Sequence, residues 1–433
     1  MSNSAPTGEA YLVIGGCGFL GRHIVDALIK RGESNVSVFD IVQRHFDDNI
    51  TFFTGDLANI EDIAGAIKKS GAKIVIHTAS PPHGLAADIY EKVNVVGTHN
   101  VIEACQDAGV PKLVYTSSAS VIYSGTENLI NADERIPYAG VPLDAYNDTK
   151  ARAEAAVLAA NGKDGLLTCA LRPSGIFGPG DRQAIMGFHA VVKNGQTKFQ
   201  IGDNTNLFDW TYVANVAHAH LLAADKLGVT YPVLVLHEPL APVDLSLGHH
   251  RIPTSEAHPL GPNKAPTEHD LLVARRFESD EVDPSDLRPV LRSKMDQFAD
   301  LADLPDDAEG PKVAGQAFFI NNGEPVNFWD FTRAIWRQLG HTPPYIIVLP
   351  IALGLILASL AEFFSKLTGK EPGFTRFRVT FATQNRYYDN ERARRLLGYS
   401  PVVGLVDGLD RWTSWYNGEL EKQKAVGESE KTK

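Results

Sequence analysis

The chain has 433 residues, of which 44% are hydrophobic, and a formal net charge of −11. This length is ample for one large two-lobed unit, and the lack of a basic stripe argues against nucleic-acid binding driven by charge. The three cysteines have no disulfide or metal-ligand spacing, so we expect a reducing compartment and no metal site. Residues 1–8 are polar, and we expect no secretory signal there.

The N-terminal stretch predicts a strand, a glycine loop and a helix in that order. An apolar run over 11–14 precedes Gly15-Gly16-Cys17-Gly18-Phe19-Leu20-Gly21, and apolar residues recur at helical spacing over 23–29. In such a unit Gly15 makes the tight turn, Gly18 lets the backbone approach a pyrophosphate, and Gly21 packs the helix on the sheet. The helix N-terminus favours the phosphates. This context predicts a dinucleotide site rather than a βα turn without a ligand.

The next two predicted strands lead to acidic residues. Strand 36–40 ends in Asp40, about 20 residues beyond the loop, where a carboxylate binds the adenosine ribose hydroxyls and repels a 2′-phosphate. This favours NAD, whereas the nearby Arg44 leaves NADP open. Strand 51–54 leads to Asp56. Its carboxylate either accepts a hydrogen bond from the adenine amino group or caps the N-terminus of the following helix.

Further strands alternate with helices and predict a doubly wound parallel sheet. Strand 73–77 runs into a small-residue bend at 78–82, and strand 112–116 runs into a serine cluster. Ligands collect at the carboxyl ends of such strands. We therefore expect Ser118, with Ser120 as second choice, to hold a substrate oxygen. The alternative is that the serines only form the turn that follows the strand.

Tyr146 and Lys150 are one helical turn apart and so lie on one face of a helix. A phenol has a pKa of about 10, too high for a base at neutral pH. A neighbouring ammonium favours the phenolate and lowers that pKa. The pair therefore predicts a proton acceptor for an alcohol whose hydride leaves for a nicotinamide.

The glycine-rich loop, the Asp at the end of a strand, the Ser and the Tyr-x-x-x-Lys pair follow one another along the chain. In this order they resemble the motifs of the extended short-chain dehydrogenase/reductase superfamily. Within it, the chain is similar to the 3β-hydroxysteroid dehydrogenase branch, and most like its fungal members that act on sterol-4α-carboxylates. This resemblance covers most of the chain and rests on the motifs at 13–21, 115–121, 215–220, 315–320, 322–325, 386–389 and 393–399.

The resemblance implies NAD-dependent oxidation of the 3β-hydroxyl of a 4α-carboxysterol to the 3-ketone, with loss of CO2, in C4 demethylation during ergosterol-type sterol biosynthesis. Catalysis would fall to Tyr146, Lys150 and Ser118. The residues expected at the cofactor are Gly15, Cys17, Gly18, Phe19, Leu20, Gly21, Asp40, Asp56, Leu57, Ala79, Ser80, Asn94, Thr116, Tyr146, Lys150 and Pro173.

The same resemblance implies a place on the cytoplasmic face of the endoplasmic reticulum membrane, contact with other sterol C4-demethylation enzymes, and a homodimer through the helix that carries Tyr146. Two alternatives stay open. One is another extended enzyme, such as a 3β-hydroxysteroid dehydrogenase or a nucleotide-sugar epimerase. The other is a non-catalytic scaffold that senses NAD.

We expect a Rossmann-like NAD-binding domain over 9–227, interleaved with a substrate lobe from about 172. Residues 228–313 hold 16 of the acidic residues, 8 of the basic residues and 11 of the 25 prolines, which predicts a largely disordered surface insertion. A smaller C-terminal substrate lobe follows over 314–417, and a polar tail over 418–433. Arg172 is a candidate carboxylate clamp, although an Arg-Pro pair that closes a strand is more often structural.

Residues 345–361 carry no charge. As a helix they would reach about 25 Å, short of the roughly 30 Å of a bilayer core. A fully buried helix is one interpretation, and a single span is another. We prefer a monotopic or re-entrant membrane contact that lets a sterol pass from the membrane to the active site.

Overall fold

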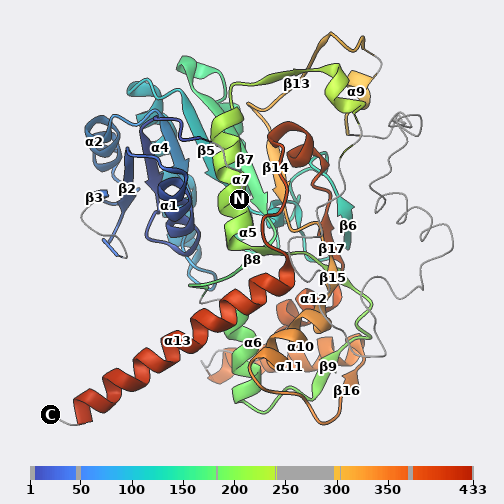
Figure 1. The fold of residues 1–433 in the computed structure, drawn as a ribbon. Coiled ribbons are helices and arrows are strands. Elements are labelled where there is room, and N and C mark those ends of the chain that lie inside the picture. Colours follow the sequence, from blue (N-terminus) through green and yellow to red (C-terminus); the bar gives the residue numbers. More distant parts are fainter. Residues whose placement is uncertain are drawn as a thin grey trace, which may run out of the picture.

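The computed structural model describes residues 5–44, 50–181, 184–238, 240, 297–302, 304–368 and 374–431. Its largest sheet is built from β1 (Tyr11–Ile14), β2 (Val36–Asp40), β3 (Thr51–Thr54), β4 (Ile74–His77), β5 (Lys112–Thr116), β7 (Leu167–Pro173) and β14 (Ala317–Ile320). All neighbouring strands are parallel, in the order β14-β7-β5-β4-β1-β2-β3 (Figure 1). The predicted Rossmann-like doubly wound sheet is confirmed.

Helices cover both faces of this sheet. One face carries α1 (Phe19–Arg31) and α7 (Val213–Lys226); the other carries α2 (Ile60–Ser70), the π-helix η1 (Glu91–Val96), α4 (Gly97–Asp107) and α5 (Ala145–Ala159). Side chains alternate along a strand, so β1 supplies both cores. Tyr11 and Val13 pack with α1 and α7, whereas Leu12 and Ile14 pack with α2 and α4.

A second, smaller sheet has the strand order β15-β10-β17-β6. Its strands come from distant parts of the chain: β6 (Leu129–Ala132), β10 (Leu207–Phe208), β15 (Val326–Asn327) and β17 (Arg386–Tyr388). Two further parallel pairs join β8 (Gly175–Phe177) to β11 (Trp210–Tyr212) and β9 (Phe199–Ile201) to β16 (Ile347–Leu349).

A helical lobe lies below the large sheet in Figure 1. It consists of α6 (Ala184–Lys193), α10 (Phe328–Gln338), α11 (Ile351–Thr368) and α12 (Arg376–Thr383), together with β9 and β16. The last helix, α13 (Leu405–Lys431), extends away from the body to the C-terminal end. The expected polar tail from 418 is thus helical as far as Lys431.

The short elements are α3 (Ala87–Tyr90), η2 (Ala119–Ile122), η3 (Lys163–Gly165), η4 (Val233–Leu236), α9 (Ala299–Ala302), η6 (Ala393–Leu397), β12 (Thr230–Pro232) and β13 (Glu309–Lys312). The last two form an antiparallel pair. The two ends of the expected insertion therefore carry secondary structure. The disorder expected for 228–313 otherwise falls on 239, 241–296 and 303, outside the described residues.

The apolar segment 345–361 is a strand followed by a helix. β16 pairs with β9, Pro350 ends the strand, and α11 then continues to Thr368. Much of α11 is exposed, with Ile356 at 59% and Leu360 at 49% exposure, while Ala358 is buried. A fully buried helix is therefore wrong. Among the residues that the structure describes, no helix is long and apolar enough to cross a membrane.

Candidate active site

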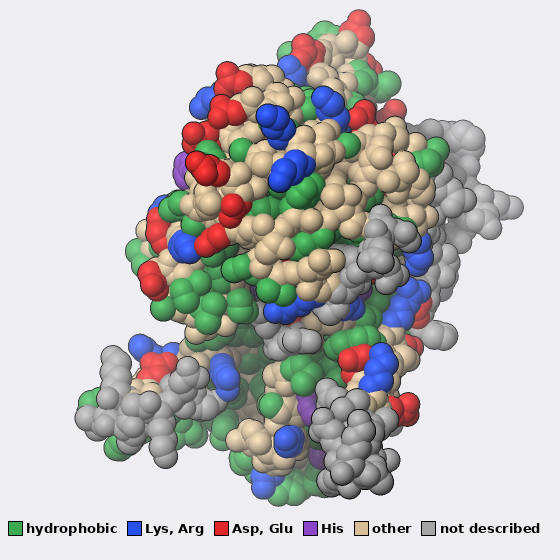
Figure 2. All heavy atoms as spheres, turned by 90° about the vertical axis from the view of Figure 1, so that its left-hand side faces the viewer, with side chains coloured by type: hydrophobic (Ala, Val, Ile, Leu, Met, Phe, Trp, Pro, Cys, Tyr) green, Lys and Arg blue, Asp and Glu red, His purple; other side chains and the backbone are tan. Residues whose placement is uncertain are grey.

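A cavity of about 2270 Å³ lies between the carboxyl ends of the large sheet and the helical lobe. Figure 2 shows the hollow between the two parts of the molecule, with hydrophobic side chains along it. Pockets for a single drug-sized ligand hold about 300–1,000 Å³. This cavity is therefore large enough for a dinucleotide and a second ligand of similar size.

The glycine loop forms one end of the cavity. Gly15 has a φ of 80°, and a Cβ on it would lie 2.6 Å from the backbone nitrogen of Ala79. A Cβ on Gly21 would lie 2.1 Å from the Gly15 carbonyl oxygen. Only glycine fits either position. α1 begins directly after Gly18 without a side-chain cap, so its first N–H groups face the ligand space as an anion site.

Asp40 ends β2 beside this loop and lines the cavity. Its Oδ2 accepts a hydrogen bond of 2.9 Å from the backbone N–H of Cys17. The thiol of Cys17 donates to the carbonyl of Arg44, which holds the chain after β2 against the loop. Asp40 therefore braces the glycine loop as well as facing the ligand space.

Asp56 also lines the cavity, at its outer rim. It forms an ion pair of 2.8 Å with Lys92 and accepts from the N–H of Ala58, and the bond from Lys92 lowers its pKa. The cap of α2 is Asn59, whose side chain accepts from the N–H of Glu61. The alternative in which Asp56 caps this helix is wrong.

The residues expected at the cofactor gather around this one cavity, with a single exception. Every one of them lines it except Asn94. Asn94 is buried in η1, where its Nδ2 donates to the Thr149 hydroxyl of α5 at 3.1 Å and its Oδ1 has no hydrogen-bond partner. Asn94 therefore contacts the helix that carries Tyr146.

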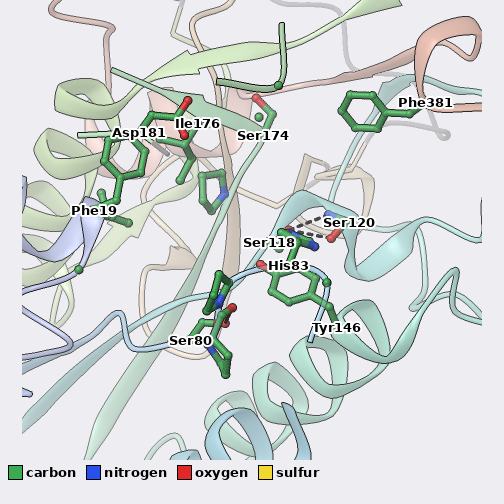
Figure 3. A pocket seen from close by; sticks show the side chains of 18 of the residues that line it. Phe19, Ser80, His83, Ser118, Ser120, Tyr146, Ser174, Ile176, Asp181 and Phe381 are labelled. Atoms are coloured by element: carbon green, nitrogen blue, oxygen red, sulfur yellow. Dashed lines mark hydrogen bonds between the residues drawn. The ribbon is translucent and has the colours of Figure 1, made fainter. Parts of the chain in front are cut away.

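Tyr146, Ser118 and Ser120 converge at the middle of the cavity (Figure 3). Tyr146 lies in the first turn of α5, which Asp144 caps by accepting from the N–H of Asn147. Ser118 caps η2, its hydroxyl lies 2.8 Å from that of Ser120, and it hydrogen-bonds to Tyr146. Both serine candidates are thus present, and Ser118 is the one bonded to the phenol.

The pKa of Tyr146 is raised to about 12. Burial is the main cause, and the hydrogen bond from Ser118 opposes it. The expectation that Lys150 lowers this pKa is not met. The Nζ of Lys150 instead donates to the Thr116 carbonyl at 2.5 Å and lies 4.3 Å from the ring centroid of Tyr115.

Lys150 is 2% exposed, and this burial lowers its pKa to about 7 although Glu154 raises it. An ammonium in this position has a low cost of deprotonation, so the side chain exchanges protons near neutral pH. Its contact with Thr116 ties the end of β5 to α5. Lys150 thereby holds the serine loop and Tyr146 in one arrangement.

His83 is a site residue that sequence reasoning missed. Its ring centroid lies 4.0 Å from that of Tyr146, and both line the cavity (Figure 3). Tyr90 fixes the loop by donating to the Pro82 carbonyl at 2.7 Å and accepting from the N–H of Leu85 at 3.1 Å. The Pro-Pro-His-Gly run after β4 was the available signal, but only the contact with Tyr146 identifies the histidine.

Arg172 is buried and does not line the cavity. Its Nε and Nη2 bind the carboxylate of Glu154 at 2.6–3.1 Å, and Tyr138 donates to the same carboxylate. The structural interpretation of Arg172 is confirmed.

The end of the cavity opposite the glycine loop is apolar. Its lining side chains come from α10, β9, α11 and α12, namely Trp329, Trp336, Phe199, Ile201, Leu357, Ala361, Phe377 and Phe381. The reacting groups therefore lie between a polar, glycine-lined end and an aromatic, aliphatic one. Such a site suits a dinucleotide next to a large apolar molecule.

A doubly wound sheet with a glycine loop after β1, a Ser just after β5, and a Tyr and a Lys on α5 defines the extended short-chain dehydrogenase class. The model of the 3-beta hydroxysteroid dehydrogenase/isomerase family matches residues 12–233 and 299–351. The chain belongs to this family.

Curated relatives match nearly the whole chain. The sterol-4-alpha-carboxylate 3-dehydrogenase, decarboxylating, of Schizosaccharomyces pombe is 41% identical over 95% of this chain and 98% of the relative. Its Saccharomyces cerevisiae counterpart is 38% identical over 95% of this chain and 99% of the relative. The human protein of that name is 36% identical over 92% and 86%.

Solved structures share the fold at low identity. The UDP-glucose 4-epimerase of Thermus thermophilus in complex with NAD has a TM-score of 0.57 at 20% identity, over 94% of this chain and 99% of the other. The enzyme WbmH of Bordetella bronchiseptica with NAD+ has a TM-score of 0.59 at 15% identity, over 95% and 99%.

Proposed function

We propose that this protein oxidises the 3β-hydroxyl of a 4α-carboxysterol to the 3-ketone, with NAD as the oxidant and with loss of the carboxyl group as CO2. The observation that carries the proposal is the cavity in which Tyr146 and Ser118 stand between the glycine loop and an aromatic pocket. The relatives that bear the sterol-4-alpha-carboxylate name over nearly their full length support the substrate.

The residues at the polar end of the cavity fit NAD. The tight glycine loop leaves backbone N–H groups at the start of α1 for the pyrophosphate, and Asp40 provides a carboxylate for the ribose hydroxyls. That carboxylate disfavours NADP. Bound there, NAD supplies the acceptor for the hydride that leaves C3 of the sterol.

The chain's own residues handle the proton. Ser118 donates to the sterol oxygen and holds it beside the Tyr146 oxygen, which in its phenolate form takes the proton of the alcohol as the C3–H bond breaks. Lys150 keeps the end of β5 against α5 through Thr116 and receives or returns protons near neutral pH. His83 packs on the phenol and shields it from water.

The carboxyl group leaves because of the ketone. Oxidation places a carbonyl at C3, so the C4 carboxylate becomes β to it. The C4–carboxyl bond then breaks, its electron pair moves toward the C3 oxygen, and a proton is taken up at C4. No residue has to supply electrons for this step.

We further propose that the protein rests on the cytoplasmic face of the endoplasmic reticulum membrane through α11 and acts beside the other enzymes of sterol C4 demethylation. The cavity lining includes Leu357 and Ala361 of α11, so an apolar substrate would enter at the membrane-facing lobe. We also expect a homodimer through α5, which size measurement by light scattering would test.

The test is to incubate purified protein with NAD and a 4α-carboxysterol while NADH and CO2 are measured together. We expect the two products in a ratio of about one, and Tyr146→Phe to lower kcat by about 10²–10⁴-fold because the proton acceptor is removed. UDP-sugars serve as the competing substrate class. Turnover of a UDP-sugar alone would support an epimerase, and full function of Tyr146→Phe in cells that lack the native enzyme would support a non-catalytic scaffold.

A further inference from the structure

The proposed reaction needs a proton at C4 that the oxidation step does not deliver there. When the C4–carboxyl bond breaks, its electron pair spreads over C4, C3 and the C3 oxygen as an enolate. Ser118 and Tyr146 hold that oxygen, so their hydroxyl groups reach the oxygen rather than C4. A proton adds to C4 from above or below the plane of the enolate. The site therefore needs a second proton donor beside Tyr146.

His83 is the one histidine among the described residues that line the cavity. Its ring centroid lies 4.0 Å from that of Tyr146, and the two ring planes are inclined by 48°. Figure 3 shows His83 next to Tyr146 and Ser118. C4 is bonded to C3, whose oxygen these two hydroxyl groups hold, so C4 lies in the same part of the cavity. The imidazole is therefore placed to act on C4.

The neighbouring titratable side chains that line the cavity are engaged elsewhere. Lys150 is 2% exposed, and its Nζ donates to a backbone carbonyl. The Oδ1 of Asp144 accepts the N–H bond that caps α5. The hydroxyl of Tyr123 donates to the side chain of Gln384. His83 is thus the side chain left to serve as an acid beside the phenol.

The surroundings of His83 favour release of a proton from its imidazolium. Burial lowers the pKa of this histidine, Asp144 opposes this, and the charge of Arg386 adds to it. A carboxylate at C4 of the bound substrate favours the imidazolium, and this support ends when CO2 leaves. His83 keeps an accessible surface within the cavity, so solvent restores the proton afterwards.

The loop that carries His83 is held on both sides of this residue. Tyr90 donates to the carbonyl of Pro82 at 2.7 Å and accepts from the N–H of Leu85 at 3.1 Å. The ring of Tyr90 also lies 5.8 Å from that of Tyr146. A donor fixed in this way reaches only one face of the enolate.

We propose that His83 is a catalytic residue that donates a proton to C4 of the sterol after CO2 has left. The inference rests on the proposed function and adds the proton donor for its last step. The imidazolium N–H bond breaks, and its proton is bound by the electron pair of the C3–C4 double bond. The carbonyl at C3 is restored, and the neutral imidazole takes a proton from solvent. Over the whole step, the carboxylate and one proton become CO2 and a C4–H bond.

The test follows the hydrogen that C4 gains. Native enzyme and NAD convert, in D2O, a 4α-carboxysterol whose second C4 substituent is hydrogen, and borohydride reduces the ketone at once so that the label does not exchange. We expect deuterium at C4 in one configuration, because a fixed donor reaches one face. His83→Gln should give both configurations, since solvent then supplies the proton from either face.

The control variant is His99→Gln, because His99 is exposed and does not line the cavity. It should keep the single configuration of the native product. The affinity for NADH, measured by fluorescence, shows that each variant is folded.

A second variant, His83→Ala, leaves space for an added imidazole. We expect a burst of NADH from the first turnover and then a steady rate about 10²–10⁴-fold below the native rate, because the enolate occupies the site until it is protonated. Added imidazoles should restore the rate in the order of their acid strength and should restore the single configuration. A histidine that only fills space would be replaced equally well by imidazoles of any acid strength.

The outcomes distinguish the two proposals. If His83→Gln keeps the native configuration at C4, or if the native enzyme gives both configurations, the inference is wrong while the proposed function stands. If the native enzyme forms neither NADH nor CO2 from the acid, the proposed function itself fails.

Discussion

Tyr146 is a neutral phenol in its present surroundings. Burial raises its pKa to about 12, and Ser118 provides the one hydrogen bond that opposes this. Lys150 donates to Thr116 and packs on Tyr115, so its charge is used to join β5 to α5. The phenolate that alcohol oxidation requires is therefore a minor species at neutral pH.

The pH dependence of the reaction follows from this protonation state. With saturating NAD, we expect kcat/KM for sterol oxidation to rise by up to about tenfold per pH unit between about pH 6 and about pH 9, because the deprotonated phenol is the active form. Stopped-flow measurement of NADH formation would give the profile. NADH affinity measured over the same range is the control, and a plateau that begins near pH 7 would contradict a phenol pKa of about 12.

At the scale of elements, Asp209 joins three strands. It stands between β10 and β11, and its Oδ2 accepts from the Tyr388 N–H of β17 and from Asn321 just after β14. Burial raises the pKa of Asp209 to about 7. The native state thus holds a proton on this carboxyl at pH values where the unfolded chain has already lost it.

Asp209→Asn should remove the contribution of this carboxyl to the pH dependence of stability. A raised carboxyl pKa contributes stability at low pH that is lost as pH rises from about 4 to about 7. The amide oxygen can accept the same two hydrogen bonds. We therefore expect the free energy of unfolding of the variant to rise relative to that of the native protein by up to about 4 kcal/mol across that pH range. Urea unfolding at several pH values measures it. The control is Asp107→Asn, which changes an exposed carboxyl, and its plot of unfolding free energy against pH should run parallel to that of the native protein. A parallel plot for Asp209→Asn would contradict the raised pKa of the Asp209 carboxyl.

Elements with a strong local signal were predictable. The glycine loop, Asp40 and the alternation of strands and helices each depend on residues close in sequence. The segment 345–361 was not, because a continuous apolar run has no period that separates a strand from a helix. Its division at Pro350 depends on the pairing of β16 with β9.

At the scale of the whole molecule, long-range pairing decided what the sequence left open. β10 and β17 have two and three residues and carry no periodic signal, yet their pairing brings Arg386 next to Tyr123. His83 likewise reaches Tyr146 from a loop that hydrogen-bonds to Tyr90. Contacts of this kind cannot be read from one sequence.

The exposed apolar surface is unevenly spread over the molecule. Half of the exposed large hydrophobic residues of the described chain fall between 345 and 377, on β16 and the two residues before it, on α11 and on α12. The cavity reaches the same helices through Leu357 and Phe377. If a bilayer covered α11, the apolar end of the active site would therefore face the bilayer.

We therefore expect the double variant Ile356→Asp, Leu360→Asp to bind phospholipid vesicles at least about tenfold more weakly, because each side chain would otherwise bury an apolar surface worth about 1.5–3 kcal/mol. Both side chains are exposed and neither lines the cavity. Vesicle flotation measures the partition. Val141→Asp is the matched control, since Val141 is 78% exposed and lies far from α11 in the sequence. We expect kcat/KM to fall for sterol presented in vesicles and to stay near the native value for sterol dispersed in detergent. Equal vesicle binding by the double variant and the native protein would show that α11 does not face the membrane.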